Sequence, residues 1–227
     1  MTPLAAAIAI ALAFLVGSTP FGYLIARAKG IDIRKHGSGN IGASNVGRVL
    51  GKKLGLICFG LDVLKGLVPT LAAGLVLGTV GTLDVPAADA WIWLGVMAAT
   101  VLGHLFTPWL GFKGGKGVAT SLGAMLGVAP ALTLPALLAF IIWITTLRIW
   151  RYVGLSSVLA AFALPIGVGV IFLIFDRADA MVPFLAISSA LAVLVVFKHR
   201  GNLARIAAGT EPKVDWLGGR DKRSEQA

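Results

Sequence analysis

Long apolar runs separated by short polar intervals dominate this sequence. Six runs contain no Asp, Glu, Lys or Arg: Thr2–Ala26, Gly66–Leu83, Ala90–Phe112, Gly117–Leu147, Tyr152–Phe175 and Ala180–Phe197. Each is close to or longer than the roughly 18–20 residues that a helix needs to cross the hydrocarbon core of a bilayer. Hydrophobic residues make up 57% of the chain and charged residues only 13%. The pattern predicts an all-α integral membrane protein.

The run Gly117–Leu147 is long for one membrane span and short for two. Pro130 and Pro135 divide it near the middle, and proline breaks a helix because it lacks an N–H donor and clashes with the preceding turn. We therefore predict two short helices here, and the sequence leaves open whether both cross the bilayer fully. The chain is expected to form about seven transmembrane helices, some of them short or broken.

Charge placement predicts the orientation of the helices. Basic intervals alternate along the chain with acidic ones: Arg27–Lys53, Lys113–Lys116, Arg148–Arg151 and the tail from Lys198 are basic, whereas Leu83–Ala90 and Asp176–Asp179 are mainly acidic. By the positive-inside rule the N-terminus lies outside and the C-terminus is cytoplasmic. The net charge of +10 is explained by this asymmetry, so no nucleic-acid partner is expected. We predict a single polytopic domain over residues 1–211 and a polar cytoplasmic tail over residues 212–227.

Three polar, glycine-rich patches interrupt the apolar pattern, all on the predicted cytoplasmic side. They are His36–Arg48, Gly111–Gly117 and Lys198–Asn202. Glycines let backbone N–H groups approach a ligand closely, and Lys, Arg and His side chains supply positive charge. The three patches together predict one shared site for a phosphorylated substrate.

The first two patches carry most of the candidate phosphate contacts. In the first, Arg48 can bind a phosphate through two parallel hydrogen bonds. In the second, a glycine-rich turn opens a helix, where free N–H groups and the helix dipole favour anions. Gly117 occupies the position where a nucleotide-binding P-loop requires Ser or Thr, so the turn indicates phosphate but not nucleotide hydrolysis. The alternative for Lys113 and Lys116 is a tight turn with lysines that extend to the membrane surface.

The third patch and two further groups are weaker signals. His199 and Asn202 lie three residues apart, Arg205 follows three residues further on, and all three would share one helix face. Asp62 and Lys65 have the same spacing and can pair inside the membrane, either as a structural ion pair or as support for the site. His104 and Ser157 lie near the inner ends of helices and could face the same cavity.

In combination, these residues resemble a known family. The segments GSTPFGYLIAR (Gly17–Arg27), GSGNIGASNVGR (Gly37–Arg48), DVLKG (Asp62–Gly66), GHLFTPWLGFKGGKGVAT (Gly103–Thr120), RYVGLSS (Arg151–Ser157) and HRGNLARIAAGTE (His199–Glu211) are similar to those of the bacterial PlsY family. Its members are acyl-phosphate-dependent glycerol-3-phosphate acyltransferases of the membrane. The motifs agree in order, spacing and inferred sidedness.

The resemblance implies a reaction and a location. An acyl group would move from acyl phosphate to the 1-hydroxyl of glycerol 3-phosphate, which gives lysophosphatidic acid and phosphate in the first acylation step of phospholipid synthesis. The protein would be a multi-pass enzyme of the bacterial cell (inner) membrane with its active site facing the cytoplasm. No metal or other cofactor is expected. The implied partners are the two substrates, membrane lipids and a soluble enzyme that makes acyl phosphate.

The resemblance also assigns roles to individual residues. The glycerol 3-phosphate contacts would be Ser38, Ser44, Arg48, His199 and Asn202. The acyl-phosphate contacts would be Lys113, Gly114, Gly115, Lys116 and Gly117. The catalytic residues would be Lys116, His199, Asn202 and Ser157, and the supporting residues Asn40, Asn45, Asp62 and Lys65. The GLSS spelling leaves open whether Ser156 or Ser157 is the family's polar residue.

For the mechanism we expect direct transfer without an acyl-enzyme, because acyl phosphate already carries a good leaving group. Cys58 lies in an apolar segment and no serine stands in a nucleophile-elbow motif. The attacking hydroxyl's proton would pass to a substrate phosphate, with His199 as the alternative base. Two other classes stay open at this point: a transporter or flippase for phosphorylated solutes, and a membrane anchor that scaffolds a cytoplasmic partner.

Overall fold

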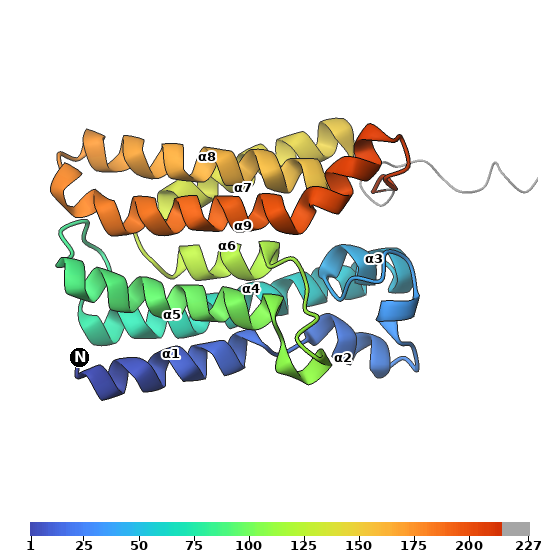
Figure 1. The fold of residues 1–227 in the computed structure, drawn as a ribbon, viewed down its shortest axis with the longest axis horizontal. Coiled ribbons are helices and arrows are strands. Elements are labelled where there is room, and N and C mark those ends of the chain that lie inside the picture. The colour runs from blue at the N-terminus through green and yellow to red at the C-terminus, as the bar shows by residue number, and fades with distance from the viewer. Residues whose placement is uncertain (215–227) are drawn as a thin grey trace, which may run out of the picture.

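The structure, a computed structural model, describes residues 1–214, and its regular elements in that range are all helical (Figure 1). The α-helices are α1 (Pro3–Gly17), α2 (Phe21–Arg27), α3 (Ala43–Leu50), α4 (Lys52–Leu77), α5 (Ala87–Leu105), α6 (Val118–Leu126), α7 (Thr133–Trp150), α8 (Val153–Ile174) and α9 (Met181–Ala207). Short 3₁₀ turns are η1 (Ile33–Lys35), η2 (Pro108–Leu110) and η3 (Ala178–Ala180). The predicted all-α class is confirmed.

Six helical segments within the described range are long and apolar enough to cross a membrane, α1 and α2 together counting as one. The predicted break in Gly117–Leu147 is present, since α6 ends at Leu126 and α7 begins at Thr133. With 9 residues, α6 rises about 14 Å, roughly half of the hydrocarbon thickness. The expected count of about seven therefore resolves into six long segments and one half-length helix.

The first apolar run is also broken, between α1 and α2. Pro20 follows directly after Thr19 and cannot donate to a helical hydrogen bond. Other elements satisfy the carbonyl groups that the break leaves free: Thr107 Oγ1 donates to Ser18 O at 2.6 Å, and Lys65 Nζ donates to Thr19 O at 2.7 Å. Irregular backbone at membrane depth is tolerated where protein groups take up its hydrogen bonds in this way.

The helices form two groups with α6 between them. Helices α1, α4 and α5 pack together on one side, and α7, α8 and α9 on the other (Figure 1). Helix α6 packs closely on α4, where a Cβ on Gly66 would lie 2.2 Å from Thr120 O and a Cβ on Gly123 would lie 1.9 Å from Val63 O. Small residues allow such close approach of two membrane helices. The seam between the two groups is where a cavity can form.

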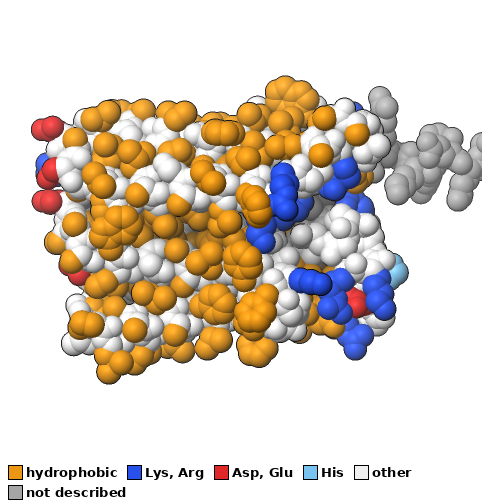
Figure 2. Space-filling view, viewed as in Figure 1, with side chains coloured by type: hydrophobic (Ala, Val, Ile, Leu, Met, Phe, Trp, Pro, Cys, Tyr) orange, Lys and Arg blue, Asp and Glu red, His pale blue; other side chains and the backbone are white. Residues whose placement is uncertain are grey.

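The outer surface fits a bilayer. Large apolar side chains point outward, with Leu4, Val76 and Ile174 all more than 70% exposed. In Figure 2 Lys and Arg gather at one end of the molecule, the end where the described chain finishes, and acidic side chains gather at the opposite end near the N-terminus. The two ends therefore differ in charge as predicted, whereas their assignment to cytoplasm and exterior stays a prediction.

The division into a domain over residues 1–211 and a tail over residues 212–227 also stays a prediction, because residues 215–227 lie outside the described range. One residue assigned to the tail, Val214, is buried against the bundle. Its N–H donates to Arg151 O at 2.9 Å, and Arg151 Nε donates to Val214 O at 3.0 Å. The chain is therefore tied to the bundle at least as far as Val214.

Candidate active site

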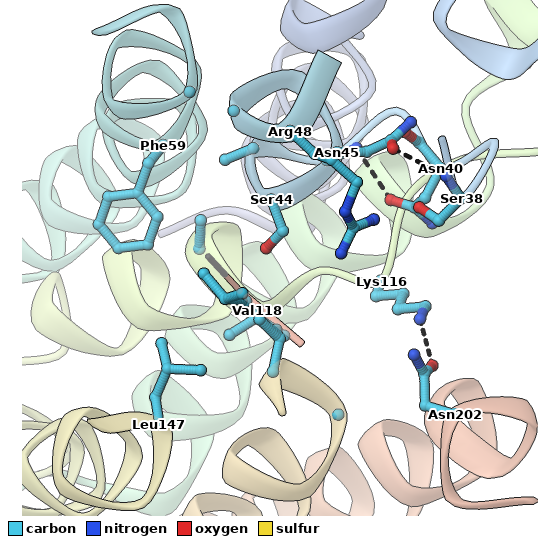
Figure 3. A pocket seen from close by; sticks show the side chains of 18 of the residues that line it. Ser38, Asn40, Ser44, Asn45, Arg48, Phe59, Lys116, Val118, Leu147 and Asn202 are labelled. Carbon is cyan, nitrogen blue, oxygen red and sulfur yellow. Dashed lines mark hydrogen bonds between the residues drawn. The ribbon is translucent and has the colours of Figure 1, made fainter. Parts of the chain in front are cut away.

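A cavity of about 580 Å³ lies at the basic end, and all three polar patches contribute to its wall. The charged and polar side chains of the wall are those of Ser38, Asn40, Ser44, Asn45, Arg48, Lys52, Asp62, His104, Lys116, Arg148, His199, Asn202, Arg205 and Glu211. These residues come from α3, α4, α5, α7, α9 and the segments before α3, before α6 and after α9, so the structure brings together patches that are far apart in the sequence (Figure 3). The other part of the wall is apolar and includes Phe59, Phe140 and Leu147.

The loop before α3 is held in shape by Asn45. Its amide nitrogen donates to His36 O at 3.0 Å and to Asn40 O at 2.9 Å, and its oxygen accepts from Ser38 N at 2.9 Å. Asn40 Oδ1 accepts from Gly42 N at 2.8 Å in a local turn. Asn45 and Asn40 therefore shape the loop with the same atoms that a ligand would otherwise engage.

Arg48 and Ser38 are exposed, Ser44 is half-buried, and all three line the cavity. Within residues 1–214, no side-chain hydrogen bond or ion pair engages Arg48. Its guanidinium points toward the same space as Ser44 and Lys116 (Figure 3). An arginine in this arrangement is free to bind a phosphate with two hydrogen bonds.

The glycine turn lies between η2 and α6. Gly117 precedes α6 with a φ of 79°, a left-handed conformation that favours glycine. Lys116 and Gly117 line the cavity, whereas Lys113 is exposed and, with Gly114 and Gly115, lies outside its lining. The structure thus places only the end of the predicted acyl-phosphate loop in the cavity wall.

Lys116 belongs to a chain of polar contacts that reaches α9. Its ammonium donates to Asn202 Oδ1, Asn202 Nδ2 donates to Glu211 Oε1, and Arg205 Nε lies 2.7 Å from Glu211 Oε2. Burial lowers the pKa of Lys116 below its ordinary value, Glu211 opposes that change, and the cations Arg205 and Arg48 add to it. The site therefore concentrates positive charge around one lysine.

His199 and Asn202 share one face of α9, as predicted, and both are buried at the cavity wall. His199 Nδ1 lies 2.9 Å from Val195 O. Because a carbonyl only accepts, Nδ1 carries the proton in this contact. Nε2 is buried and has no hydrogen-bond partner within the described residues, which leaves its lone pair available to a ligand.

Ser157 lies apart from this polar wall. Its hydroxyl donates to Val153 O at 2.8 Å and accepts from Trp143 Nε1 at 3.2 Å. It lines a second, almost entirely apolar pocket of about 70 Å³ that shares Phe59, Val118, Phe140 and Trp143 with the main cavity. Ser156 is fully buried, donates to Tyr152 O at 3.0 Å, and lines neither space. Of the two serines, Ser157 is the one next to the cavity.

The predicted pair of Asp62 and Lys65 is present and buried. Lys65 Nζ lies 2.7 Å from Asp62 Oδ1. Asp62 reaches the cavity wall, while Lys65 lies behind it.

Residues 7–209 of this chain match the family described as glycerol-3-phosphate acyltransferase. The chain belongs to this family. The relative from Geobacter sulfurreducens, a glycerol-3-phosphate acyltransferase, is 45% identical over 88% of this chain and 93% of its own length. The relative of the same name from Aquifex aeolicus is 40% identical over 89% of this chain and 95% of its own length.

Solved structures agree with the family assignment. The crystal structure of PlsY, described as an integral membrane glycerol 3-phosphate acyltransferase in its glycerol 3-phosphate form, superposes with a TM-score of 0.78 at 38% identity, covering 94% of this chain and 97% of that one. Its lysophosphatidic acid form gives a TM-score of 0.75 at 38% identity, with 92% and 95% covered. The chain is thus an integral membrane acyltransferase of the PlsY type.

In this acyltransferase the predicted site residues leave out five polar residues of the cavity wall: Lys52, His104, Arg148, Arg205 and Glu211. Glu211 and Arg205 complete the contact chain from Lys116, and His104 lies behind the glycine turn. The sequence did place Arg205 on the face of His199 and Asn202, and it placed His104 near the cavity, but neither was given a role there. Glu211 gave no such signal, because it lies beyond the end of α9 and reaches Asn202 only after the chain turns back.

Proposed function

We propose that this glycerol-3-phosphate acyltransferase takes its acyl group from acyl phosphate and transfers it directly to the 1-hydroxyl of glycerol 3-phosphate. The products are lysophosphatidic acid and inorganic phosphate. The single observation that carries the proposal is a cavity whose wall combines cations from four separate segments with a large apolar part. Two phosphate-bearing substrates, one with a lipid tail, match that combination.

The polar side supports the binding of two anionic groups. Arg48, with Ser38 and Ser44 beside it, is assigned to the phosphate of glycerol 3-phosphate. Lys116 and the backbone of Gly117 at the start of α6 are assigned to the phosphate of the donor, where free N–H groups and the helix dipole favour an anion. In this arrangement Lys116 would lie between the two phosphates and could stabilise charge on either one. Lys113, Gly114 and Gly115 would act by shaping this turn.

The apolar side supports an acyl chain. Phe59, Val118, Phe140 and Trp143 belong to both the main cavity and the smaller apolar pocket, so the two spaces share a wall. A chain that starts at the cavity can continue along this wall. Ser157, in the smaller pocket and bonded to Trp143, would then lie beside the donor's acyl group.

The proposed chemical step needs no covalent enzyme intermediate. The 1-hydroxyl oxygen attacks the acyl carbon, the bond between that carbon and the phosphate oxygen breaks, and phosphate leaves with the electron pair. The hydroxyl proton passes to a phosphate oxygen of the substrates. The unpaired Nε2 of His199 accepts a hydrogen bond from the attacking glycerol, and Asn202 keeps Lys116 in place.

The location is proposed from the charge difference between the two ends of the molecule. We propose that the basic end of the molecule, and with it the cavity, faces the cytoplasm of a bacterial cell and that the N-terminus lies outside. A soluble enzyme would supply the acyl phosphate from the cytoplasm. Labelling of single cysteines placed at Lys35 and at Asp176 in intact cells, with Cys58 replaced, would test this orientation.

The experiment that tests the function is phosphate release by the purified protein in detergent. Acyl phosphate is supplied with and without glycerol 3-phosphate, and acyl-CoA serves as the competing donor. The proposal expects phosphate and lysophosphatidic acid in equal amounts, only when acyl phosphate and the acceptor are both present. Product from acyl-CoA but not from acyl phosphate would overturn the assignment of the donor.

A further inference from the structure

Behind the glycine turn lies a cluster of buried polar groups that the proposed chemical step does not use. Asp62 and Lys65 come from α4, His104 from α5 and Thr120 from α6, and all four are at most 5% exposed. His104 Nδ1 lies 3.2 Å from Thr120 Oγ1 and 3.7 Å from Asp62 Oδ1. The cluster thus links the three helices that meet at the turn.

His104 supports the turn directly. The N–H of Gly115 donates to His104 O at 3.1 Å, and the N–H of Gly114 donates to Leu105 O at 3.2 Å. A Cβ placed on Gly115 would lie 2.1 Å from His104 Nε2, so the imidazole ring lies directly against the backbone of the turn. The position of this ring therefore fixes the residues that lead into Lys116.

Asp62 creates an electrostatic problem for such a site. Its carboxylate lies 3.7 Å from His104 Nδ1, and it also reaches the wall of a cavity that takes anions. A negative charge in that wall repels phosphate, and the repulsion is strong where water is scarce.

Lys65 supplies the balancing charge from outside the cavity. Its ammonium lies 2.7 Å from Asp62 Oδ1, with only 2% and 3% of the two side chains exposed, and it also donates to Thr19 O at 2.7 Å. Since Lys65 does not line the cavity, it cannot itself touch a ligand there. Its position suits compensation of charge and not binding.

We propose that Lys65 is a positioning residue that neutralises Asp62, so that the carboxylate can lie beside His104 behind the glycine turn without weakening phosphate binding. The inference rests on one part of the proposed function, namely that the cavity binds an anionic ligand. It predicts that the harm done by removing Lys65 comes from the exposed charge of Asp62, and that removing this charge as well repairs it.

The test is a double-variant cycle of Lys65→Met, Asp62→Asn and the two combined, with glycerol 3-phosphate binding measured by calorimetry on detergent-purified protein. Lys65→Met is expected to weaken binding about tenfold or more, as for one close uncompensated charge. The double variant should return the Kd to within about threefold of the unaltered protein, because no net charge is left at the wall. Lys53→Met, an exposed lysine on the same helix, is the matched control.

Two results would overturn the proposal. One is folded Lys65→Met protein with an unchanged Kd, and the other is a double variant that binds no better than Lys65→Met. If Lys65→Met does not fold, Asp62→Asn decides: equal or tighter binding with a lower kcat is expected, and weaker binding contradicts charge compensation. This binding test does not depend on the identity of the donor. If the unaltered protein binds glycerol 3-phosphate but makes no product from acyl phosphate, the proposed function is refuted, and the proposal for Lys65 is not affected.

Discussion

The ammonium of Lys116, on the turn before α6, donates a hydrogen bond to the side-chain oxygen of Asn202 on α9. This contact joins the two groups of helices across the cavity. Asn202 is itself held by Glu211, which pairs with Arg205 at 2.7 Å. The position of the central cation thus depends on residues from opposite sides of the seam.

Replacement of Lys116 by methionine should lower kcat/KM for acyl transfer by about 10²–10³-fold, the loss typical of one donor to charge that develops in the transition state. Lys116→Arg keeps the charge and should lose less. Steady-state kinetics with both substrates varied would measure the effect, and Lys53→Met serves as the charge-matched control. Equal activity of Lys116→Met and the unaltered protein would exclude a role in catalysis.

The pH profile should report the same lysine. Burial lowers the pKa of Lys116, so its ammonium is fully charged at low pH and loses its proton below the pH at which an exposed lysine does. Activity should therefore fall on the alkaline side before pH 10.5, the ordinary lysine value. Lys116→Arg, whose guanidinium stays charged, should move this fall to higher pH. Identical alkaline limbs for the two proteins would assign the limb to another group.

His199→Gln separates hydrogen bonding from proton abstraction. If the Nε2 of His199 only accepts a hydrogen bond from the acceptor substrate, the variant should raise the KM for glycerol 3-phosphate and lower kcat by no more than about tenfold. Loss of a general base would instead lower kcat by about 10²–10⁴-fold. Initial rates at saturating concentrations of both substrates distinguish the two results.

Gly115→Ala should abolish most of the activity, because the added methyl group would lie 2.1 Å from His104 Nε2 and must displace the ring or the turn. Gly60→Ala on α4 is the matched control, since nothing lies within 4 Å of a Cβ at that position. There alanine should be neutral or stabilise the helix by up to about 1 kcal/mol. Thermal unfolding in detergent and acyl-transfer rates would be compared for the two variants.

Asn45→Ala should destabilise the loop before α3 and raise the KM for glycerol 3-phosphate. It removes a buried side chain that donates to two carbonyl groups and accepts from Ser38 N, and groups left unpaired cost about 1–3 kcal/mol. Asn45→Asp keeps the acceptor and loses the donors, so its KM should lie between those of the unaltered protein and Asn45→Ala. An unchanged KM in Asn45→Ala would show that the loop is held by other contacts.

The membrane fold was predictable from the sequence because apolar runs and charge asymmetry are local signals. The break in Gly117–Leu147 followed from two prolines, and the α6–α7 boundary confirms it. The sequence predicted two short helices and left open whether both cross the bilayer; it did not show that α6 is the short one and that α7 has 18 residues. The position of α6 depends on close packing against α4 through Gly66 and Gly123. That contact is between segments far apart in the chain.

The candidate site was also predictable only in part. Arg48, Lys116, His199 and Asn202 carried signals of residue type and spacing, and they share one cavity. The role of Asn45 in shaping the loop and the placement of Ser157 on the apolar side depend on the direction in which each side chain points. A pattern of residue types does not contain that direction.

The division of the cavity into a charged side and an apolar side has a consequence for how rates are measured. Under the proposed function the acceptor dissolves in water, whereas the donor's tail partitions into the bilayer. The acceptor therefore acts by its molar concentration and the donor by its mole fraction among the surrounding lipids. At fixed amounts of enzyme and donor, added inert phospholipid should slow the reaction by surface dilution, and added buffer should not relieve it.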